Sequence, residues 1–76
     1  MQELIRHIAT ALVDDAAGVE VKELDQEDAL VIELRVAPDD LGKVIGKQGR
    51  TARAMRSLLT AATAGRDKET RLEIVE

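Results

Sequence analysis

The sequence contains no cysteine, phenylalanine, tyrosine or tryptophan. Without cysteine the chain has no disulfide, no thiolate metal ligand and no cysteine nucleophile, which suits a reducing compartment. Without aromatic residues the core must be built from Leu, Ile, Val, Ala and Met. The only histidine is His7 and the only serine is Ser57, and no histidine that could activate Ser57 lies near it in sequence. No carboxylate or histidine set has metal-ligand spacing, so we expect neither an enzyme, a metal site nor a cofactor.

Long apolar runs are also absent. No segment approaches the roughly 18 consecutive apolar residues of a membrane span. The start, "MQELIRHIATALVDD", lacks the basic start and the unbroken apolar stretch of a signal peptide. With 76 residues, of which 45% are hydrophobic and 34% charged, the composition fits one globular domain over residues 1–76. We expect a soluble cytoplasmic protein with no membrane partner.

The 11 basic side chains are outnumbered by 15 acidic ones, but they are concentrated in one segment. The formal net charge is −4, and residues 1–40 carry eleven acidic and three basic side chains. Residues 41–66, in contrast, carry six basic side chains and no acidic one. Exposed charges are screened beyond about 8 Å at physiological salt, so an anion at this segment would feel the local cations more than the distant acids.

Apolar periodicity predicts an α+β protein of order α-β-β-α-α-β, with three helices packed on one face of a three-stranded sheet. The short polar turn "DQED" indicates that the first two strands are antiparallel. Pro38 ends the second strand because it has no N–H for the sheet. In chain order the predicted elements are a helix over 3–14, strands over 18–24 and 29–37, helices over 41–45 and 50–64, and a strand over 70–76.

The same patterns predict which side chains are buried. The first helix would bury Leu4, Ile5, Ile8, Ala11 and Leu12. The last helix would bury Ala52, Met55, Leu59 and Ala62, with Leu58 beside them. The second strand would direct Leu30, Ile32, Leu34 and Val36 to the helices, and Val31, Glu33 and Arg35 to a wetter face. We expect Asp39 and Asp40 to cap the helix over 41–45.

The stretch "VIGKQGR" lies between the last two predicted helices. A glycine pair alone is typical of a tight turn, since glycine adopts positive φ at little cost. Here, however, Gly46 and Gly49 flank one cation and one polar donor, Lys47 and Gln48, at the start of a helix whose free N–H groups attract anions. Further basic residues, Arg50 and Arg53, follow in the first turns of the next predicted helix. The sequence therefore favours a phosphate-binding loop.

A nucleotide-binding P-loop does not fit this stretch. Its pattern is G-x-x-x-x-G-K-[ST] after a strand. Only three residues separate Gly42 from Gly46, Gln48 stands where the magnesium-binding hydroxyl is needed, and a helix precedes the loop. The dinucleotide-binding fingerprint is excluded as well, because the chain has no Gly-x-Gly.

The element order and the segment "VAPDDLGKVIGKQGRTARAMRSLL" resemble a type II KH domain, and more narrowly the small single-domain bacterial KH proteins of the KhpA type. KH domains clamp about four nucleotides of single-stranded RNA or DNA with a GXXG loop. The resemblance covers essentially the whole chain. By position, it implies that Gly46–Gly49 clamp the nucleic-acid backbone and that Ile45 supports the apolar floor of the groove on which bases rest. Arg50 and Arg53 would add phosphate contacts. The RNA-binding residues it implies are Lys43, Ile45, Gly46, Lys47, Gln48, Gly49, Arg50 and Arg53.

The resemblance also implies partners and a cellular role. KhpA-type proteins associate with a larger KH protein of the KhpB/Jag type, and the pair is expected to act as an RNA chaperone linked to cell-wall synthesis and cell shape. Because base stacking on aromatic rings contributes about 1–3 kcal/mol per base, a chain without aromatic residues is expected to bind weakly and with little sequence preference. Avidity from a homodimer or from the partner would compensate.

A second function class fits the end of the last predicted helix, "LLTAATAG". Leu58, Ala61 and Ala62 are small or apolar and would let another helix approach closely. The alternative is therefore a KH-fold interaction or dimerisation module with little affinity for RNA. The two functions are compatible with each other, and they differ in the substitutions that would abolish activity.

Overall fold

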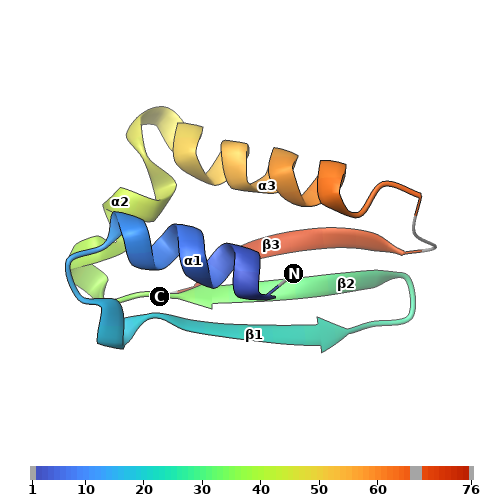
Figure 1. Ribbon diagram of the computed structural model, residues 1–76, viewed down its shortest axis with the longest axis horizontal. Helices are drawn as coiled ribbons and strands as arrows, with labels where there is room; N and C mark the ends of the chain where they lie inside the picture. The colour runs from blue at the N-terminus through green and yellow to red at the C-terminus, as the bar shows by residue number, and fades with distance from the viewer. Residues whose placement is uncertain (1, 66–67, 76) are drawn as a thin grey trace.

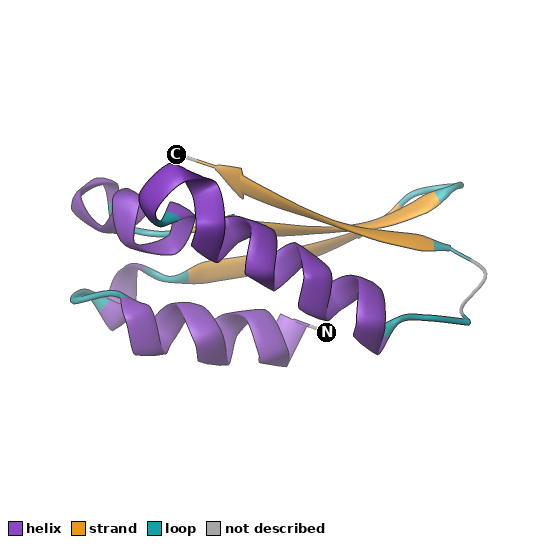
Figure 2. Cartoon of the chain, turned by 90° about the horizontal axis from the view of Figure 1, so that it is seen from above, coloured by secondary structure: helices purple, strands orange, loops and turns teal. Residues whose placement is uncertain are grey.

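The computed structural model describes residues 2–65 and 68–75, and it contains a three-stranded sheet with helices on one side (Figures 1 and 2). The predicted α+β order is confirmed. Short 3-10 turns at 16–18, 38–40 and 47–49 lie in the connections. In chain order the elements are α1 (Gln2–Leu12), β1 (Glu20–Asp25), β2 (Ala29–Arg35), α2 (Leu41–Ile45), α3 (Arg50–Ala62) and β3 (Glu69–Val75).

The sheet has the order β1-β2-β3, with β2 in the centre. β1 pairs antiparallel with β2, as the short turn predicted, and β3 pairs parallel with β2. Parallel neighbours need a crossover connection, and α2 and α3 supply it. α2 therefore follows the carboxyl end of β2, and the α2–α3 junction lies at this end of the molecule (Figure 1).

The helices and the sheet enclose one aliphatic core. α1 lies against β1 and β2, and α3 lies against β3. As the composition predicted, aliphatic side chains and one methionine fill the space between them. The buried cluster consists of Ile5, Ala9, Val21, Ile32, Leu34, Val36, Val44, Met55, Leu59 and Leu72.

Both long helices bury a slightly different stripe from the predicted one. In α1, Ala11 and Leu12 are exposed, because the buried stripe passes through Ile5 and Ala9 and continues to the half-buried Val13. In α3, Ala62 and Leu58 are exposed and the stripe continues to Thr63. The Thr63 hydroxyl donates a 2.7 Å hydrogen bond to the Leu59 carbonyl, which satisfies its polar group in the core.

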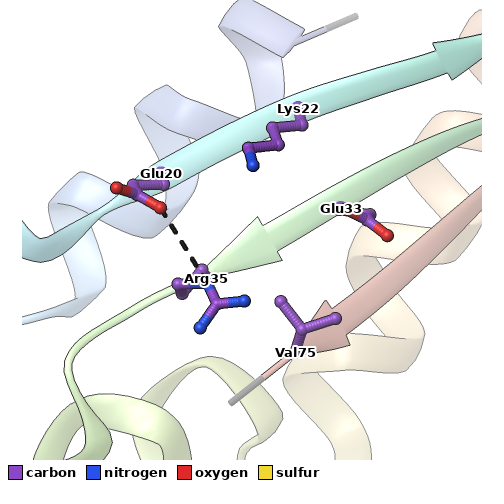
Figure 3. A pocket seen from close by; sticks show the side chains of 5 residues that line it. All are labelled: Glu20, Lys22, Glu33, Arg35 and Val75. Carbon is purple, nitrogen blue, oxygen red and sulfur yellow. Dashed lines mark ion pairs between the residues drawn. The ribbon is translucent and has the colours of Figure 1, made fainter.

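The second face of the sheet is not covered by the helices. Glu20, Lys22, Glu33, Arg35 and Val75 surround a small hollow there (Figure 3), and Arg35 Nε lies 3.9 Å from Glu20 Oε2. Contrary to the prediction, Val31 is buried on this face, because its register neighbours Leu24 and Arg71 flank it. Cations and carboxylates alternate here, so this face offers an anion no uniform positive charge.

The ends of the elements lie within two residues of the predictions. Leu30, at the hairpin end of β2, is only half-buried. β3 begins at Glu69, and the predicted last residue of that strand, Glu76, lies outside the described residues, as does Arg66. Within 2–65 and 68–75, no helix has the length and apolar content needed to cross a membrane.

We expect Leu59→Ala to reduce the free energy of unfolding by about 2–5 kcal/mol, because Leu59 is fully buried and truncation leaves a cavity. The matched control is Leu12→Ala, since Leu12 is 38% exposed at the end of α1, and we expect it to cost about 1 kcal/mol or less. Urea denaturation of both variants measures the difference. Equal losses would contradict the packing of α3 described above.

Candidate nucleic-acid interface

The predicted GXXG loop is the junction between α2 and α3. α2 ends at Ile45, and its C-cap is Gly46, whose N–H donates to the Gly42 carbonyl at 2.9 Å. One tight turn follows, closed by a 3.0 Å hydrogen bond from the Gly49 N–H to the Gly46 carbonyl. α3 then begins at Arg50 with Gly49 as its N-cap, and no side chain caps its first amides. The Arg50 N–H donates to the Lys47 carbonyl, so the amides of α3 that follow Arg50 are the ones that a ligand accepting hydrogen bonds would meet without competition from a capping side chain.

The two glycines of the loop are required for different reasons. Both have positive φ, 78° at Gly46 and 74° at Gly49, which side chains disfavour. At Gly46 there is also no room, because a Cβ would lie 2.3 Å from Thr51 Oγ1 and 2.8 Å from the Thr51 backbone nitrogen. At Gly49 nothing lies within 4 Å of such a Cβ. Gly46 therefore permits the close approach of α2 to α3, and Gly49 leaves open space above the helix start.

Gln48, at the tip of the loop, is the only described non-glycine residue with positive φ, at 59°. A left-handed backbone costs a residue with a side chain roughly 1 kcal/mol or more. The Gln48 side chain is exposed, and Arg50 Nη2 makes a long contact of 3.5 Å with Gln48 Oε1. This contact leaves the amide nitrogen of Gln48 as the group available to an incoming acceptor.

The cations behind the loop are exposed and free of carboxylates. Lys47, Arg50 and Arg53 are all exposed, and in the part of the chain that the structure describes none of them forms an ion pair. Ile45 adds a partly exposed apolar side chain directly before the loop, at 37% exposure. The structure thus places seven of the eight predicted residues together around one loop and helix start.

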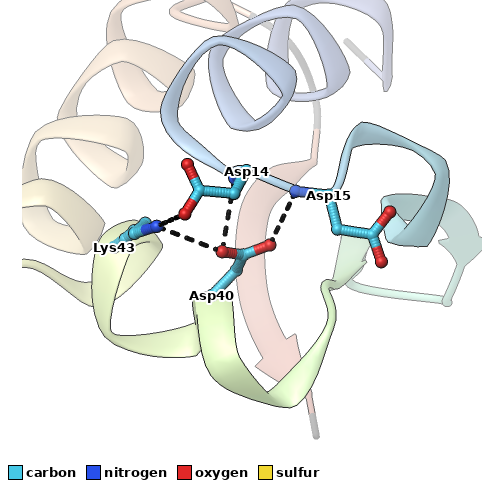
Figure 4. Close-up of polar contacts among 4 residues, drawn as sticks. All are labelled: Asp14, Asp15, Asp40 and Lys43. Atoms are coloured by element: carbon cyan, nitrogen blue, oxygen red, sulfur yellow. Dashed lines mark hydrogen bonds and ion pairs between the residues drawn. The ribbon is translucent and has the colours of Figure 1, made fainter.

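Lys43, the eighth predicted residue, has a different environment. Its ammonium group forms an ion pair with the Asp14 carboxylate and lies 3.4 Å from Asp40 Oδ1 (Figure 4). The hydrogen bond to Asp14 is the main reason that the pKa of Lys43 is raised above its ordinary value. Lys43 is therefore already neutralised by two carboxylates on the side of α2.

Asp40 is the buried centre of this polar cluster, and only 3% of it is exposed. The Asp15 backbone N–H donates to Asp40 Oδ2 at 3.0 Å, and the Asp14 N–H donates to Oδ1 at 3.3 Å. The Asp15 bond is the largest cause of a lowered Asp40 pKa; burial opposes it, and Asp14 and Lys43 add to it. The prediction that Asp40 caps α2 was wrong in its bonding: Asp40 stands at the N-cap position, but its side chain binds the connection after α1.

Sequence reasoning did not identify this cluster. The i, i+3 spacing of Asp40 and Lys43 was visible as a local pair. The contribution of Asp14 and Asp15 was not visible, because it depends on how α1 packs beside α2.

We expect Gly46→Ala to reduce the free energy of unfolding by about 1–3 kcal/mol, because it combines positive φ with a steric clash against Thr51. Gly42→Ala is the control: a Cβ at Gly42 would meet nothing within 4 Å, and alanine favours a helix by roughly 0.5–1 kcal/mol over glycine. Thermal unfolding compares the two. A Gly46→Ala variant as stable as wild type would contradict the described junction.

The lowered pKa of Asp40 predicts how its contribution to stability depends on pH. Because the unfolded state has the higher pKa, near the ordinary 3.8, it binds more protons in acid. The contribution of the Asp40 carboxylate is therefore complete above about pH 4 and disappears as pH falls through the lower folded value. We expect Asp40→Asn to have a lower free energy of unfolding than wild type at neutral pH, and the difference between the two proteins to become smaller in acid. Asp39→Asn is the exposed control, and a gap independent of pH would contradict this interpretation.

The chain is similar to a set of known KH-domain proteins along its whole length. A family model described as KhpA/KhpB, KH domain, matches residues 2–74. The chain is 53% identical over 76 residues to the RNA-binding protein KhpA of Halalkalibacterium halodurans, covering all of both chains. It is 51% identical over 75 residues to the RNA-binding protein KhpA of Caldanaerobacter subterraneus, covering 99% of this chain and 100% of the relative.

A third relative, the RNA-binding protein KhpA of Aquifex aeolicus, is 49% identical over 76 residues, which cover 100% of this chain and 96% of the relative. No solved structure gave a significant match. The helices on one face and the mixed sheet agree with the type II KH fold that the sequence predicted. The family match and the identities together show that the chain belongs to the KhpA/KhpB family of KH-domain proteins.

Proposed function

We propose that this chain is a non-enzymatic RNA-binding protein, a single KH domain over residues 1–76, that grips the backbone of single-stranded RNA. The contact surface is the loop Gly46–Gly49 with the first two turns of α3. The observation that carries this proposal is the pairing of an uncapped helix start with exposed cations that, among the described residues, have no carboxylate partner. Three similar KH proteins carry names that describe them as RNA-binding.

Each part of the loop has a distinct role in this proposal. Gly46 and Gly49 let the RNA backbone approach the main chain without obstruction by side chains. The amides after Arg50 in the first turn of α3, which no side chain caps, donate to phosphate oxygens, while Lys47, Arg50 and Arg53 supply charge. Gln48 adds a neutral donor at the tip, and Ile45 offers an apolar surface on which a base can rest.

The same surface sets the affinity. No aromatic ring exists in the chain to stack on bases, so phosphate contacts dominate and binding is weak and tolerant of sequence. We propose that a second KH protein of the KhpB/Jag type strengthens binding by avidity. The family description supports this because it names KhpA and KhpB together. On this basis the pair acts in the cytoplasm as an RNA chaperone linked to cell-wall synthesis and cell shape.

A specific observation also supports the alternative function, an interaction or dimerisation module. Leu58 is 49% exposed on α3, and Ala61 and Ala62 lie one turn further along the same side, both exposed. Small residues around an exposed leucine allow close approach of a second helix. We expect Leu58→Lys to reduce self-association in sedimentation velocity experiments if this surface forms a homodimer, with RNA contacts at the loop unaffected. An unchanged distribution of species would exclude the surface as a dimer contact.

The RNA proposal is tested by a salt titration of binding to a labelled poly(U) oligonucleotide. If three phosphates are neutralised, log K should fall against log salt with a slope of about −2. We expect Lys47→Asp/Gln48→Asp to lose detectable binding, because two negative charges then face the phosphates.

The matched control for this double variant is Lys22→Asp/Gln26→Asp, which makes the same two substitutions at exposed positions of β1 and of the turn after it and should bind as wild type does. Circular dichroism confirms that every variant is folded. Wild-type affinity in the folded loop variant would show that RNA contacts another surface.

A further inference from the structure

The Asp40 cluster joins two parts of the chain that are far apart in sequence. Asp40 stands at the start of α2, and the amides it binds, Asp14 and Asp15, belong to the connection between α1 and β1 (Figure 4). Both oxygens of the Asp40 carboxylate have partners. Oδ2 accepts from the Asp15 N–H, and Oδ1 accepts from the Asp14 N–H and also lies 3.4 Å from the Lys43 ammonium. Lys43 in turn bonds the exposed Asp14 carboxylate, so the cluster closes on itself.

We propose that Asp40 and Lys43 are positioning residues of the RNA site. They tie α2 to the α1–β1 connection and so hold the GKQG loop in place, and Lys43 does not contact phosphate. This inference rests on the function proposed above for the loop, and it replaces the predicted phosphate contact of Lys43.

The shortness of α2 explains why such a tether is needed. α2 has five residues, about 7.5 Å of helix, and only Val44 within it is buried. Val44 and the half-buried Leu41, which also packs against the core, do not by themselves fix the direction of so short a helix. Asp40 fixes one end, and Gly46, the first residue of the loop, follows the other end. A displacement at Asp40 is therefore transmitted to the loop within two turns.

Charge explains why Lys43 is unsuited to phosphate. Asp14, Asp40 and Lys43 together carry a net charge of about −1, so the cluster repels an incoming phosphate. To bind RNA, Lys43 would have to leave two carboxylates, one of which is buried. Lys47 lies beyond Gly46, outside α2. Among the described residues it forms no ion pair, so it can bind a phosphate without first leaving a carboxylate.

The first experiment tests the tether without RNA. Amide spectra of ¹⁵N-labelled Asp40→Asn are compared with those of Asp39→Asn, which changes an exposed neighbouring carboxylate. We expect the resonances of Gly46, Gln48 and Gly49 to shift in Asp40→Asn and to remain in place in Asp39→Asn. Unchanged loop resonances in folded Asp40→Asn would overturn the proposal. If Asp40→Asn does not fold, the same comparison is made with Lys43→Gln.

The second experiment separates positioning from phosphate contact by salt titration with poly(U). Lys47→Gln should make the slope of log K against log salt shallower by about 0.7, the loss of one phosphate contact on a single strand. Lys43→Gln should weaken binding about two- to tenfold with the slope unchanged. Lys43→Gln/Asp14→Asn keeps the net charge of the cluster at about −1, as in wild type. Its charge therefore does not differ from that of wild type, and it should retain the wild-type slope.

The outcomes separate this inference from the proposed function. A slope that becomes shallower in both Lys43 variants as much as in Lys47→Gln would show that Lys43 contacts phosphate, and would overturn the inference while supporting RNA binding. Wild-type affinity in Lys43→Gln would overturn positioning by Lys43. Absence of binding by wild type would refute the proposed function, and the RNA-free spectra would still decide whether Asp40 positions the loop.

Discussion

The absence of a side chain at Gly46 is the constraint on which the interface depends. The backbone of Thr51 and its hydroxyl occupy the space that a Cβ would need, so only glycine allows α2 to pass this close to α3. The approach turns the chain sharply between α2 and α3 and brings the start of α3, which no side chain caps, directly after the loop. The parallel pairing of β2 with β3 makes the α2–α3 crossover necessary, and so this junction is a product of the sheet topology as well as of the loop sequence.

Electrostatics explains how a protein of net charge −4 can present a site for a polyanion. Some cations elsewhere in the described chain pair with carboxylates, as Lys68 does with Asp25 and Arg71 does with Glu69, whereas Arg56 Nε donates to the Leu72 carbonyl. Among the described residues the loop cations have no such partners, and the acidic residues of the first half lie in other elements. Screening over about 8 Å keeps most of those acids from acting on the loop. The local arrangement of charge, rather than its total, determines what this surface attracts.

Much of this organisation was predictable from the sequence, because it depends on local signals. Alternation in 29–37 and helical spacing in 50–64 predicted the elements, and two glycines around Lys47 and Gln48 marked the loop. The predictions that were wrong concern features that depend on how the elements pack together. A rotation of each helix by a fraction of a turn exposed Leu12 and Ala62, and periodicity does not specify such rotations. The contacts of Asp40 with Asp14 and Asp15 join segments that are distant in sequence, and no local pattern records them.

An NMR titration of ¹⁵N-labelled protein with single-stranded poly(U) tests directly whether the Gly46–Gly49 loop and the start of α3 contact RNA. We expect the amide resonances of Gly46 to Arg53 to shift progressively and saturate, because these amides and their neighbouring cations receive the phosphates. We expect little change at Glu20, Lys22 and Glu33 on the uncovered face of the sheet. Saturable shifts confined to that face, with the loop resonances unmoved, would show that RNA does not bind at the loop.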